Sequence, residues 1–564
     1  MIRIQPSILN RFVNGVVSAV NPLSQPQASV PHAINFLFDD ELDSATTRKG
    51  LTEIGAGTAS NPVLGIHNHR GTNDFALVSV SDGTNADIYK STGSTWTKSL
   101  EDDTKDLEVS FAQFLDTTVR VNGTDAVKAT KDATTWTSTS TDPSSTNLDV
   151  GNMPNGTIVK VYKQRLQVIS GSDVYISSTP LANLDYDAQS ANFTVGAKLT
   201  GGTSGATAII LADADAGTTG TLKLSSVSNI FQNNETITDE DGGSATANLA
   251  SAFKISWTTG NKENLQVDPK NGSDILAVGT VGGVEGIEIF FKDNGAYRYN
   301  GSFLDPKPFT TFGCTSKFST AEFSGGIGFA NQEGYCFTNG SSAKIITNPI
   351  RDWWEAIPSA YLDNISAYAN NDFLLISIGD ITKKDSFGKD KTYSNVVLYK
   401  SLTNDNWSIL SFSKEFRGFT RYFDSGNQEI WGGTDSGEVH EIFNGTSDDG
   451  APIFFEIESP DIIGDNVLST KAVSEYIGVY GKRLKGAKVY TSVDDKGWSE
   501  SLGGCEEDYT KLPIEKQDFN KLKLKLSNNQ DGAPITLREL IVPHIETDGT
   551  GGQISTEQRF NSQR

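Results

Sequence analysis

The sequence predicts an all-β protein, and its composition, turns and hydrophobic pattern all support that fold class. The 564 residues include 54 glycines, and 36% of the residues are hydrophobic, which favours many short strands joined by turns. Apolar and polar residues alternate with a period of two over many short stretches, which is the pattern of half-buried strands. A chain of this length exceeds one hydrophobic core, so we expect several domains.

Residues 1–55 are predicted to form an N-terminal arm and a first strand. Asn, Gly and Ser interrupt the apolar residues of the opening stretch, MIRIQPSILNRFVNGVVSAV, which therefore lacks the continuous apolar run of a signal peptide. No stretch of the chain approaches the roughly 20 apolar residues of a membrane span. We expect a protein without a cleaved signal and without a membrane span.

A hairpin pattern recurs seven times between residues 56 and 450. Each copy is a strand, a Gly/Asp/Asn turn and a second strand. The copies are DFALVSVSDGTNADIYKS, TTVRVNGTDAVKAT, QRLQVISGSDVYISS, IEIFFKDNGAYRYNG, GGIGFANQEGYCFTNG, DFLLISIGDITKKDSFGKDKTYSNVVLYKS and QEIWGGTDSGEVHEIFNG. Ile88 and Val127, at matching places in the first two copies, are 39 residues apart. Periods of about 40–50 residues are typical of β-propeller blades, so we predict a β-propeller of about seven blades.

An inserted small β module, residues 192–253, is predicted to divide the propeller into a first part, residues 56–191, and a second part, residues 254–450. The module contains two similar segments, AKLTGGTSGATA from Ala197 and ETITDEDGGSATA from Glu235. Each segment has the pattern of a short strand, a tight turn and a second short strand. We therefore expect a duplicated β-hairpin, which a loop between blade strands tolerates at little entropic cost.

Residues 451–546 are predicted to form a separate C-terminal β-sandwich-like domain, and residues 547–564 a flexible polar tail. In the stretch NKLKLKLS, Lys521, Lys523 and Lys525 alternate with leucines. The alternation predicts a strand whose lysines form a solvated face, with an interaction edge as the alternative.

Aromatic residues recur near the ends of several predicted blades. We expect Trp96, Trp136 and Trp407 to pack between blades, with a sugar-binding stripe as the alternative. Trp353 and Trp354, in RDWWEA, are predicted to pack from a short helical link.

Acidic residues outnumber basic ones, with 70 Asp and Glu against 47 Lys and Arg, and the formal net charge is −23. This balance argues against a surface that grips phosphate backbones by releasing counterions. It favours solubility, and the alternative use is a surface along which nucleic acid passes without sticking.

No motif for catalysis or cofactor binding stands out. The glycine-rich GTVGGVEG from Gly279 opens onto a strand, whereas a dinucleotide fingerprint opens a helix. FGKDKT lacks the spacing of a phosphate-binding loop. Cys314, Cys336 and Cys505 are too scattered for a disulfide framework or a zinc site, and we expect buried thiols. We assign no catalytic, cofactor-binding or metal-ligating residue, expect no cofactor, and expect that the protein is not an enzyme.

Two groups of polar residues are the remaining candidates. His67 and His69 project from the same strand face without an evident third ligand, so exposed or hydrogen-bonded histidines are the favoured interpretation. The acidic runs at Asp213 and Asp215, and in TDEDGG from Thr238, do not follow the ligand order of an EF-hand. They are predicted to be polar turns, with a weak surface calcium site as the alternative. A carboxylate pair for glycoside hydrolysis stays open, but the sequence marks no particular pair.

Three stretches resemble the tail nozzle and packaged-DNA stabilisation (tail hub) proteins of short-tailed bacteriophages. The first is LNRFVNGVVSAVNPLSQPQASVPHAINFLFDDELDSATTRKGLTEIG, with its Arg-x-Gly turn at Arg48, Lys49 and Gly50. The second is DILAVGTVGGVEGIEIFFKDNGAYRYNGS with the following GCTSKFSTAEFSGGIGFANQEGYCFTNGSSAKIITNPI, which is similar to central propeller blades. The third, GTDSGEVHEIFNGTSDDGAPIFFEIESPDIIGDNVLSTKAVSEYIGVY, is similar to the exit from the last blade. The segment VGAKLTGGTSGATA resembles a small decoration unit of phage virion proteins.

The resemblance implies a structural virion protein in the phage tail, assembled in the host cytoplasm. It implies a homo-oligomeric ring, commonly hexameric, below the portal and adaptor proteins, which retains packaged DNA and conducts it out at infection. Implied partners are the portal and adaptor, tail fibres or spikes, and genomic DNA that passes without sequence-specific binding. The family is defined by its architecture, so no individual functional residue carries over. The alternatives are a receptor- or glycan-binding tail protein and a polysaccharide depolymerase.

Overall fold

The structure is a computed structural model, and it is mostly β, with 56% strand and 4% helix. The residues that it describes are 5–9, 12–20, 24–39, 44–56, 61–71, 74–93, 95–115, 117–137, 153–177, 181–229, 231–248, 252–254, 263–283, 285–301, 305–424, 427–463, 470–506, 508–527 and 534–547. The predicted tail, residues 547–564, lies outside the described residues except for Thr547.

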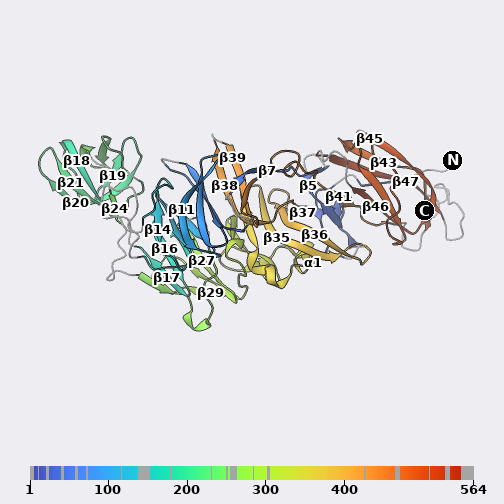
Figure 1. The fold of residues 1–564 in the computed structure, drawn as a ribbon, viewed down its shortest axis with the longest axis horizontal. Coiled ribbons are helices and arrows are strands. Elements are labelled where there is room, and N and C mark those ends of the chain that lie inside the picture. The colour runs from blue at the N-terminus through green and yellow to red at the C-terminus, as the bar shows by residue number, and fades with distance from the viewer. Residues whose placement is uncertain are drawn as a thin grey trace, which may run out of the picture.

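Six small antiparallel sheets and four antiparallel strands of a larger sheet make up the middle of the molecule (Figure 1). They are numbered here as sheets 1 to 7 in chain order, and sheet 6 is the group that belongs to the larger sheet. Sheet 1 contains β8 (Val63–His69), β9 (Phe75–Ser81), β10 (Asn85–Ser91) and β11 (Trp96–Thr104). Sheet 2 contains β12 (Ser110–Phe114), β13 (Thr117–Val121) and β14 (Lys128–Thr130). Sheet 3 contains β15 (Ile158–Tyr162), β16 (Arg165–Ser170), β17 (Asp173–Ile176) and β25 (Glu263–Gln266).

Sheets 4 to 7 follow the same plan. Sheet 4 contains β26 (Ala277–Val281), β27 (Ile287–Lys292), β28 (Gly295–Tyr299) and β29 (Lys307–Thr310). Sheet 5 contains β30 (Ala321–Phe323), β31 (Gly326–Asn331), β32 (Gly334–Thr338) and β33 (Ala343–Ile345). Sheet 6 begins with β34 (Ser366–Ala369), β35 (Phe373–Lys384), β36 (Asp390–Ser401) and β37 (Trp407–Ser411). Sheet 7 contains β38 (Phe416–Asp424), β39 (Asn427–Thr434), β40 (Glu438–Ile442) and the N-terminal strand β7 (Leu51–Ala56).

All seven predicted hairpins are confirmed, because each forms two paired antiparallel strands of one sheet; in six sheets these are inner strands, and in the three-stranded sheet 2 they are β13 and the edge strand β14. Apolar residues that lie opposite each other on the two strands of a hairpin are buried as cross-strand pairs. For example, Phe290 on β27 lies opposite Tyr297 on β28, and both are buried. The first strands of neighbouring sheets contact each other at six of the seven junctions, the exception being sheets 3 and 4, and one of the six is the contact of β38 in sheet 7 with β8 in sheet 1. The series of sheets therefore returns to its start, with β7 completing sheet 7 from the other end of the chain.

Short helices occur only as connections within the described part of the chain. The single α-helix there is α1 (Arg351–Trp354), and Trp353 and Trp354 are buried on it, which confirms the predicted helical link. The 3-10 helices are η2 (Pro269–Asn271), η3 (Lys317–Ser319), η4 (Asn348–Ile350) and η5 (Ser359–Asn364). None of the helices in the described ranges is long and apolar enough to span a membrane.

A seven-stranded sheet between β17 and β25 of sheet 3 lies at one end of the molecule (Figure 1). Its strands are β18 (Leu181–Ala191), β19 (Lys198–Gly201), β20 (Thr207–Asp215), β21 (Gly220–Ser225), β22 (Thr236–Asp239), β23 (Ser244–Ala247) and β24 (Ala252–Lys254). The two similar segments form the hairpins β19–β20 and β22–β23, and β19 pairs with β22. Because β18 pairs with both β21 and β23, the sheet closes into a small barrel. We call it the inserted barrel; it begins at Leu181, earlier than residue 192.

The C-terminal strands lie at the opposite end of the molecule, together with strands from the N-terminus (Figure 1). One sheet contains β1 (Gln5–Leu9), β5 (Phe36–Asp39), β6 (Ser44–Thr47), β43 (Thr470–Lys482), β45 (Tyr509–Phe519) and β47 (Thr536–Thr547). The other extends sheet 6 with β2 (Gly15–Val16), β3 (Ser29–Val30), β4 (His32–Ile34), β41 (Glu456–Glu458), β42 (Ile462–Ile463), β44 (Lys488–Val493) and β46 (Lys521–Ser527).

The C-terminal strands are therefore not a separate unit, which differs from the sequence-based expectation. Strand β4 pairs with β37 of sheet 6 on one side and with β41 on the other, so one sheet runs through the boundary. Ile34, Trp353 and Leu526, from three distant parts of the chain, belong to a single cluster of buried residues. The N-terminal segment thus joins sheet 6 to the C-terminal strands, because its strand β4 pairs with both.

Candidate functional site

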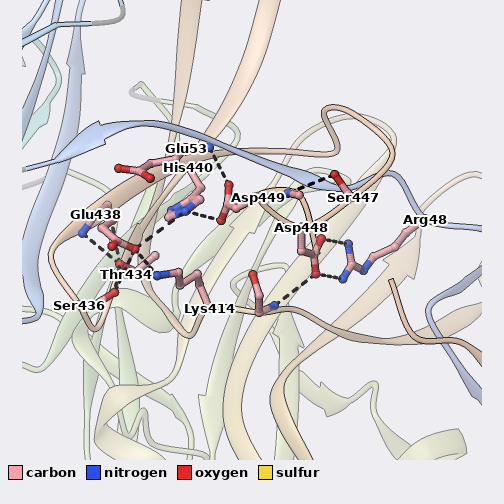
Figure 2. A network of polar contacts seen from close by, with 12 residues as sticks. Arg48, Glu53, Lys414, Thr434, Ser436, Glu438, His440, Ser447, Asp448 and Asp449 are labelled. Atoms are coloured by element: carbon pink, nitrogen blue, oxygen red, sulfur yellow. Dashed lines mark hydrogen bonds and ion pairs between the residues drawn. The ribbon is translucent and has the colours of Figure 1, made fainter. Parts of the chain in front are cut away.

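The N-terminal segment meets the end of sheet 7 at a network of polar side chains around Arg48 (Figure 2). Arg48 lies between β6 and β7 and is 1% exposed. Its Nη1 and Nη2 donate to the two carboxylate oxygens of Asp448, at 2.8 and 2.6 Å. A bidentate pair of this kind fixes the orientation of both groups.

The remaining donors of Arg48 connect other elements to the same point. Its Nε donates to Asn35 Oδ1 at 2.9 Å, and Nη1 donates to the carbonyl oxygen of Lys49 at 2.9 Å. Nη2 also donates to the carbonyl oxygen of Ser411, at the end of β37, at 2.6 Å. Arg48 therefore joins the N-terminal segment, sheet 6 and the chain that leaves sheet 7, with all five of its N–H groups engaged.

Gly50 allows the two chain segments to approach each other. The backbone N–H of Leu51 donates to the carbonyl oxygen of Ser447 at 3.1 Å. A Cβ atom at Gly50 would lie 1.9 Å from that same oxygen, which is far inside van der Waals contact. The Arg-x-Gly turn thus combines a side chain that reaches Asp448 with a residue that leaves room for the neighbouring backbone.

His440 and Asp449 extend the network along β7 and β40 (Figure 2). The His440 side chain is fully buried, and its Nε2 lies 2.9 Å from Asp449 Oδ2. The other oxygen of Asp449 accepts a hydrogen bond from the backbone N–H of Glu53 on β7 at 2.9 Å. Asp449 therefore links the strand that completes sheet 7 to the strand beside it.

Lys414 and Glu438 form the outer part of the network. Lys414 donates to Glu438, whose carboxylate also accepts from Ser436 Oγ at 3.2 Å. Burial disfavours the ionised carboxyl, but the hydrogen bond and charge of Lys414 outweigh it and lower the pKa of Glu438. The same hydrogen bond raises the pKa of Lys414, so both groups stay charged near neutral pH.

A second group of charged side chains lies where β4, β36 and β41 meet. Glu456 Oε1 lies 2.6 Å from His32 Nε2 and forms an ion pair with Lys391. Burial opposes ionisation of Glu456, but the hydrogen bond and charge of His32, followed by those of Lys391, lower its pKa to about 2. The His32 ring stacks on Trp353 with ring centres 6.0 Å apart. This group fastens the long β35–β36 hairpin to the C-terminal strands.

These two clusters hold distant segments of the chain together. Each cluster contains a nearly buried pair, Arg48–Asp448 or His32–Glu456, that joins segments far apart in the sequence. The surrounding Lys391, Lys414 and Glu438 are partly exposed.

The sequence analysis singled out Arg48 only through the family resemblance. It did not identify Asp448, His440 or Glu456 as members of these polar networks. The partners of Asp448 and Glu456, which are Arg48 and His32, lie 400 and 424 residues away, so no local pattern reports these two pairs. Asp449, in contrast, follows its partner His440 by nine residues.

His67 and His69 lie on β8 and share a face, as predicted. Both contact Oγ1 of Thr118 on β13, at 3.4 Å for His67 Nε2 and 2.9 Å for His69 Nδ1. Burial, followed by the charge of His69, lowers the pKa of His67 to about 3, so it is neutral at physiological pH. Within the described residues, no group of three or more His, Cys, Asp or Glu could hold a metal ion.

The acidic residues of the inserted barrel organise its turns. Asp239 accepts hydrogen bonds from the backbone N–H groups of Thr194, at 2.8 Å, and Gly243, at 2.5 Å. Asp213 accepts a hydrogen bond from the Tyr186 hydroxyl at 2.9 Å. These carboxylates are already engaged by donors of the chain itself.

Glu235 is a structural residue that sequence reasoning passed over. It lies at the start of the second similar segment, yet it accepts hydrogen bonds from the turn of the first one. Thr203 N, Ser204 N and Ser204 Oγ donate to it at 3.0, 2.8 and 2.8 Å, and Gln232 N donates at 2.5 Å. The two similar segments are thus held together by an acid from one and a turn from the other.

The lysine row on β46 differs from the predicted solvated face. Lys523 is 7% exposed, and its Nζ lies 3.3 Å from Asp495 and 3.6 Å from Asp461. Lys521 lies 2.8 Å from Asp495 and 2.9 Å from Asp461. The prediction is wrong at Lys523, because carboxylates from neighbouring loops cover the strand and neutralise its charge.

Packing between sheets is confirmed for Trp96, whose ring on β11 of sheet 1 lies 5.9 Å from that of Trp431 on β39 of sheet 7. Trp136 donates from Nε1 to Ser99 Oγ of β11 at 2.8 Å. Trp407 is 2% exposed within the large buried cluster. The sugar-stripe alternative therefore fails for Trp407, which has no exposed ring face.

The three cysteines are buried and free, as predicted. Burial raises the pKa of Cys505 to about 11, and burial followed by the charge of Cys314 raises the pKa of Cys336 to about 12. Both thiols are therefore protonated and unreactive near neutral pH.

Comparison with known proteins assigns no family. No family model matches the chain, and no curated protein matches its sequence. Among solved structures, one described as "YCF48 bound to D1 peptide" is similar over 70% of this chain and 97% of its own. The sequence identity is 9% and the TM-score is 0.36, too low for the likeness to bear on fold or function.

Proposed function

We propose that the seven small sheets are the blades of a seven-bladed β-propeller that β7 closes. Three observations support this arrangement. Each sheet contains one of the predicted hairpins, the first strands contact each other at six of the seven junctions between neighbouring sheets, and one of these contacts joins β38 of the last sheet to β8 of the first. A strand from the N-terminus completes the last sheet, so the ends of the series are held by main-chain hydrogen bonds.

On this scaffold, the proposed function is that of a structural virion protein of a tailed phage. The protein forms the tail nozzle or hub ring below the portal and adaptor, retains packaged DNA and conducts it out at infection. The observation that carries the proposal is the meeting of the stretches that resemble nozzle proteins. Arg48 of the first stretch forms its bidentate pair with Asp448 of the third.

The shape and charge of the chain suit this role. The inserted barrel and the C-terminal strands lie at opposite ends of an elongated molecule, so both ends can contact neighbouring subunits (Figure 1). Six copies would carry 6 × −23 = −138 charges, and acidic groups along a lumen would let DNA slide without sticking. Buried ion pairs at Arg48 and Glu456 keep the propeller and the C-terminal strands in one orientation.

Native mass spectrometry of the protein, alone and mixed with its portal and adaptor proteins, tests the proposal. We expect a ring of about six copies, either alone or on the adaptor. Mixing with the portal in the absence of adaptor is the control for nonspecific association. A monomer or trimer that ignores the adaptor would contradict the nozzle role and favour a peripheral receptor- or glycan-binding protein.

A further inference from the structure

A polar pocket of about 310 Å³ lies where the β35–β36 hairpin meets the C-terminal strands. Its walls come from four parts of the chain: the N-terminal segment, α1, the hairpin and the segment from β41 to β46. Residues that represent these walls are Ser18, Lys384, Ser386, Glu458, Trp498 and Lys525. The volume falls within the range of small-molecule binding sites, about 300–1,000 Å³.

The hairpin tip is anchored over this pocket. Phe387 packs edge-on against Trp498, with ring centres 5.4 Å apart. Ser386 Oγ donates to Glu458 on β41, and Lys391 pairs with Glu456 on the same strand. These contacts, from the tip of the hairpin and from β36, hold the hairpin against the C-terminal strands and so shape the pocket.

The carboxylates at the pocket are engaged by the protein itself. Asp352 accepts from Ser18 and from Lys383, and Asp461 lies 2.9 Å from Lys521. Asp385 accepts from the backbone N–H groups of its own turn, at Phe387 and Lys389, both at 2.9 Å. These three acids each have partners within the protein, although Asp385 uses only one of its two carboxylate oxygens.

Two ammonium groups at the pocket lack such a partner: within the described residues, neither Lys384 nor Lys525 forms an ion pair. The Lys525 Nζ lies 4.6 Å from the ring centre of Trp498 and 4.9 Å from that of Tyr490. Burial lowers the pKa of Lys525, because its charge is partly removed from water. The charges of Glu456, Glu458 and Asp385 partly offset this shift, but within the described residues none of them pairs with the ammonium, so an anion bonded directly to it would add stabilisation.

The rest of the wall suits a ligand that carries hydroxyl groups. Ser18 and Ser386 bring hydroxyls, and Glu458 and Asp385 each keep one carboxylate oxygen to which no hydrogen bond is recorded among the described residues. Trp498 adds an apolar surface beside the ammonium. The pocket therefore offers ammonium groups that can bind a carboxylate, oxygen atoms that can accept from hydroxyls, and an indole ring that can pack on the C–H face of a sugar. This combination matches an acidic sugar.

We propose that this pocket binds a carboxylated sugar residue of the uronic acid class, with its carboxylate at Lys525 and Lys384. The inference goes beyond the conduit function and does not depend on it. A ring-forming nozzle protein that carried this pocket would also contact acidic polysaccharide.

Isothermal titration calorimetry of the full-length protein with D-glucuronate, at constant ionic strength, tests the proposal. We expect saturable binding of D-glucuronate and none of D-glucose, which has the same ring but no carboxylate. Lys525→Met should weaken binding about 10- to 100-fold, as expected for the loss of a charge-assisted hydrogen bond. Lys389→Met is the matched control, because Lys389 is exposed on the same hairpin and does not line the pocket.

Two outcomes would overturn the proposal. One is D-glucuronate binding that Lys525→Met and Lys384→Met leave unchanged, or no binding at all. The other is inorganic phosphate binding as tightly as D-glucuronate, which would make the pocket a general anion site. Lys525→Arg keeps the positive charge and should keep D-glucuronate binding. Thermal unfolding of Lys525→Met is measured as well, because an altered unfolding temperature would show that its loss of binding comes from misfolding. Ring assembly is measured in a separate experiment, so the sugar-binding proposal and the nozzle proposal can each fail without the other.

Discussion

Glu288 and Gln167 form a buried pair between sheets 3 and 4 whose geometry calls for a proton. Both side chains are fully buried, and Gln167 Nε2 donates to Glu288 Oε2 at 3.1 Å. The other oxygens, Gln167 Oε1 and Glu288 Oε1, have no hydrogen-bond partner among the described residues. A protonated Glu288 can donate from Oε1 to Gln167 Oε1, which would satisfy both orphaned atoms.

The predicted consequence is a stability that falls as the pH rises. Burial raises the pKa of Glu288 from 4.5 to about 7, against the opposing charge of Lys160, the hydrogen bond from Gln167 and the charge of Lys163. Between these values the unfolded chain has lost the proton and the folded chain still holds it. The free energy of unfolding should therefore decrease from pH 4.5 to pH 7 by about 3 kcal/mol and then level off.

Urea unfolding of wild type, Glu288→Gln and Glu285→Gln across this pH range measures the effect. Glu288→Gln removes the titrating group and should abolish this part of the slope, so that the variant is more stable than wild type at pH 8. Glu285→Gln is the matched control, because it makes the same charge change at an exposed position three residues earlier. The infrared band of a protonated carboxyl, present at pH 6 in wild type and absent from Glu288→Gln, identifies the group directly. Equal slopes in wild type and Glu288→Gln would refute the reasoning.

The other predictions concern the fastening points. Arg48→Met leaves Asp448 buried without its partner and should lower the free energy of unfolding by about 3–5 kcal/mol, measured by urea denaturation; a change below about 1 kcal/mol would contradict the pairing. Gly50→Ala places a Cβ against the Ser447 carbonyl oxygen and should cost about 2–3 kcal/mol, with protection of β7 amides from hydrogen exchange lost first. Glu235→Ala should expose the inserted barrel to hydrogen exchange and leave sheets 4 to 6 unchanged. Burial opposes ionisation of Glu235, but hydrogen bonds from Ser204, Gln232 and Thr203 lower its pKa, so wild-type barrel protection should be complete above pH 4.5 and fall as the pH drops through the lowered pKa.

Local features of the fold could be predicted from the sequence, because a hairpin is encoded within about fifteen residues. Alternating apolar residues around a Gly/Asp/Asn turn identify both strands and their register, and all seven hairpins follow this pattern. The same reasoning found the duplicated hairpins of the inserted barrel. It did not find β18, the strand that closes the barrel, because LANLDYDAQSA does not repeat the similar segments.

The fastening sites could not be predicted in the same way. Lys523 alternates with leucines like any exposed strand lysine, and only its contacts with Asp461 and Asp495 bury it. Likewise, His32 lies in the N-terminal segment and meets Glu456 only because β4 inserts between β37 and β41. Such pairs depend on which strand is added to which edge.

The sequence by itself determined the all-β class, the seven hairpins and the duplicated segments, because each rests on short-range periodicity and turn chemistry. Tertiary structure alone decided that N-terminal strands complete sheet 7 and join sheet 6 to the C-terminal strands. It also decided that Arg48 and Glu456 form buried ion pairs, and that Lys384 and Lys525 at the hairpin pocket have no ionic partner in the part of the chain that the structure describes. The physical reason is that an edge strand presents unpaired N–H and C=O groups to any extended segment, so long-range packing, and not local pattern, selects its partner.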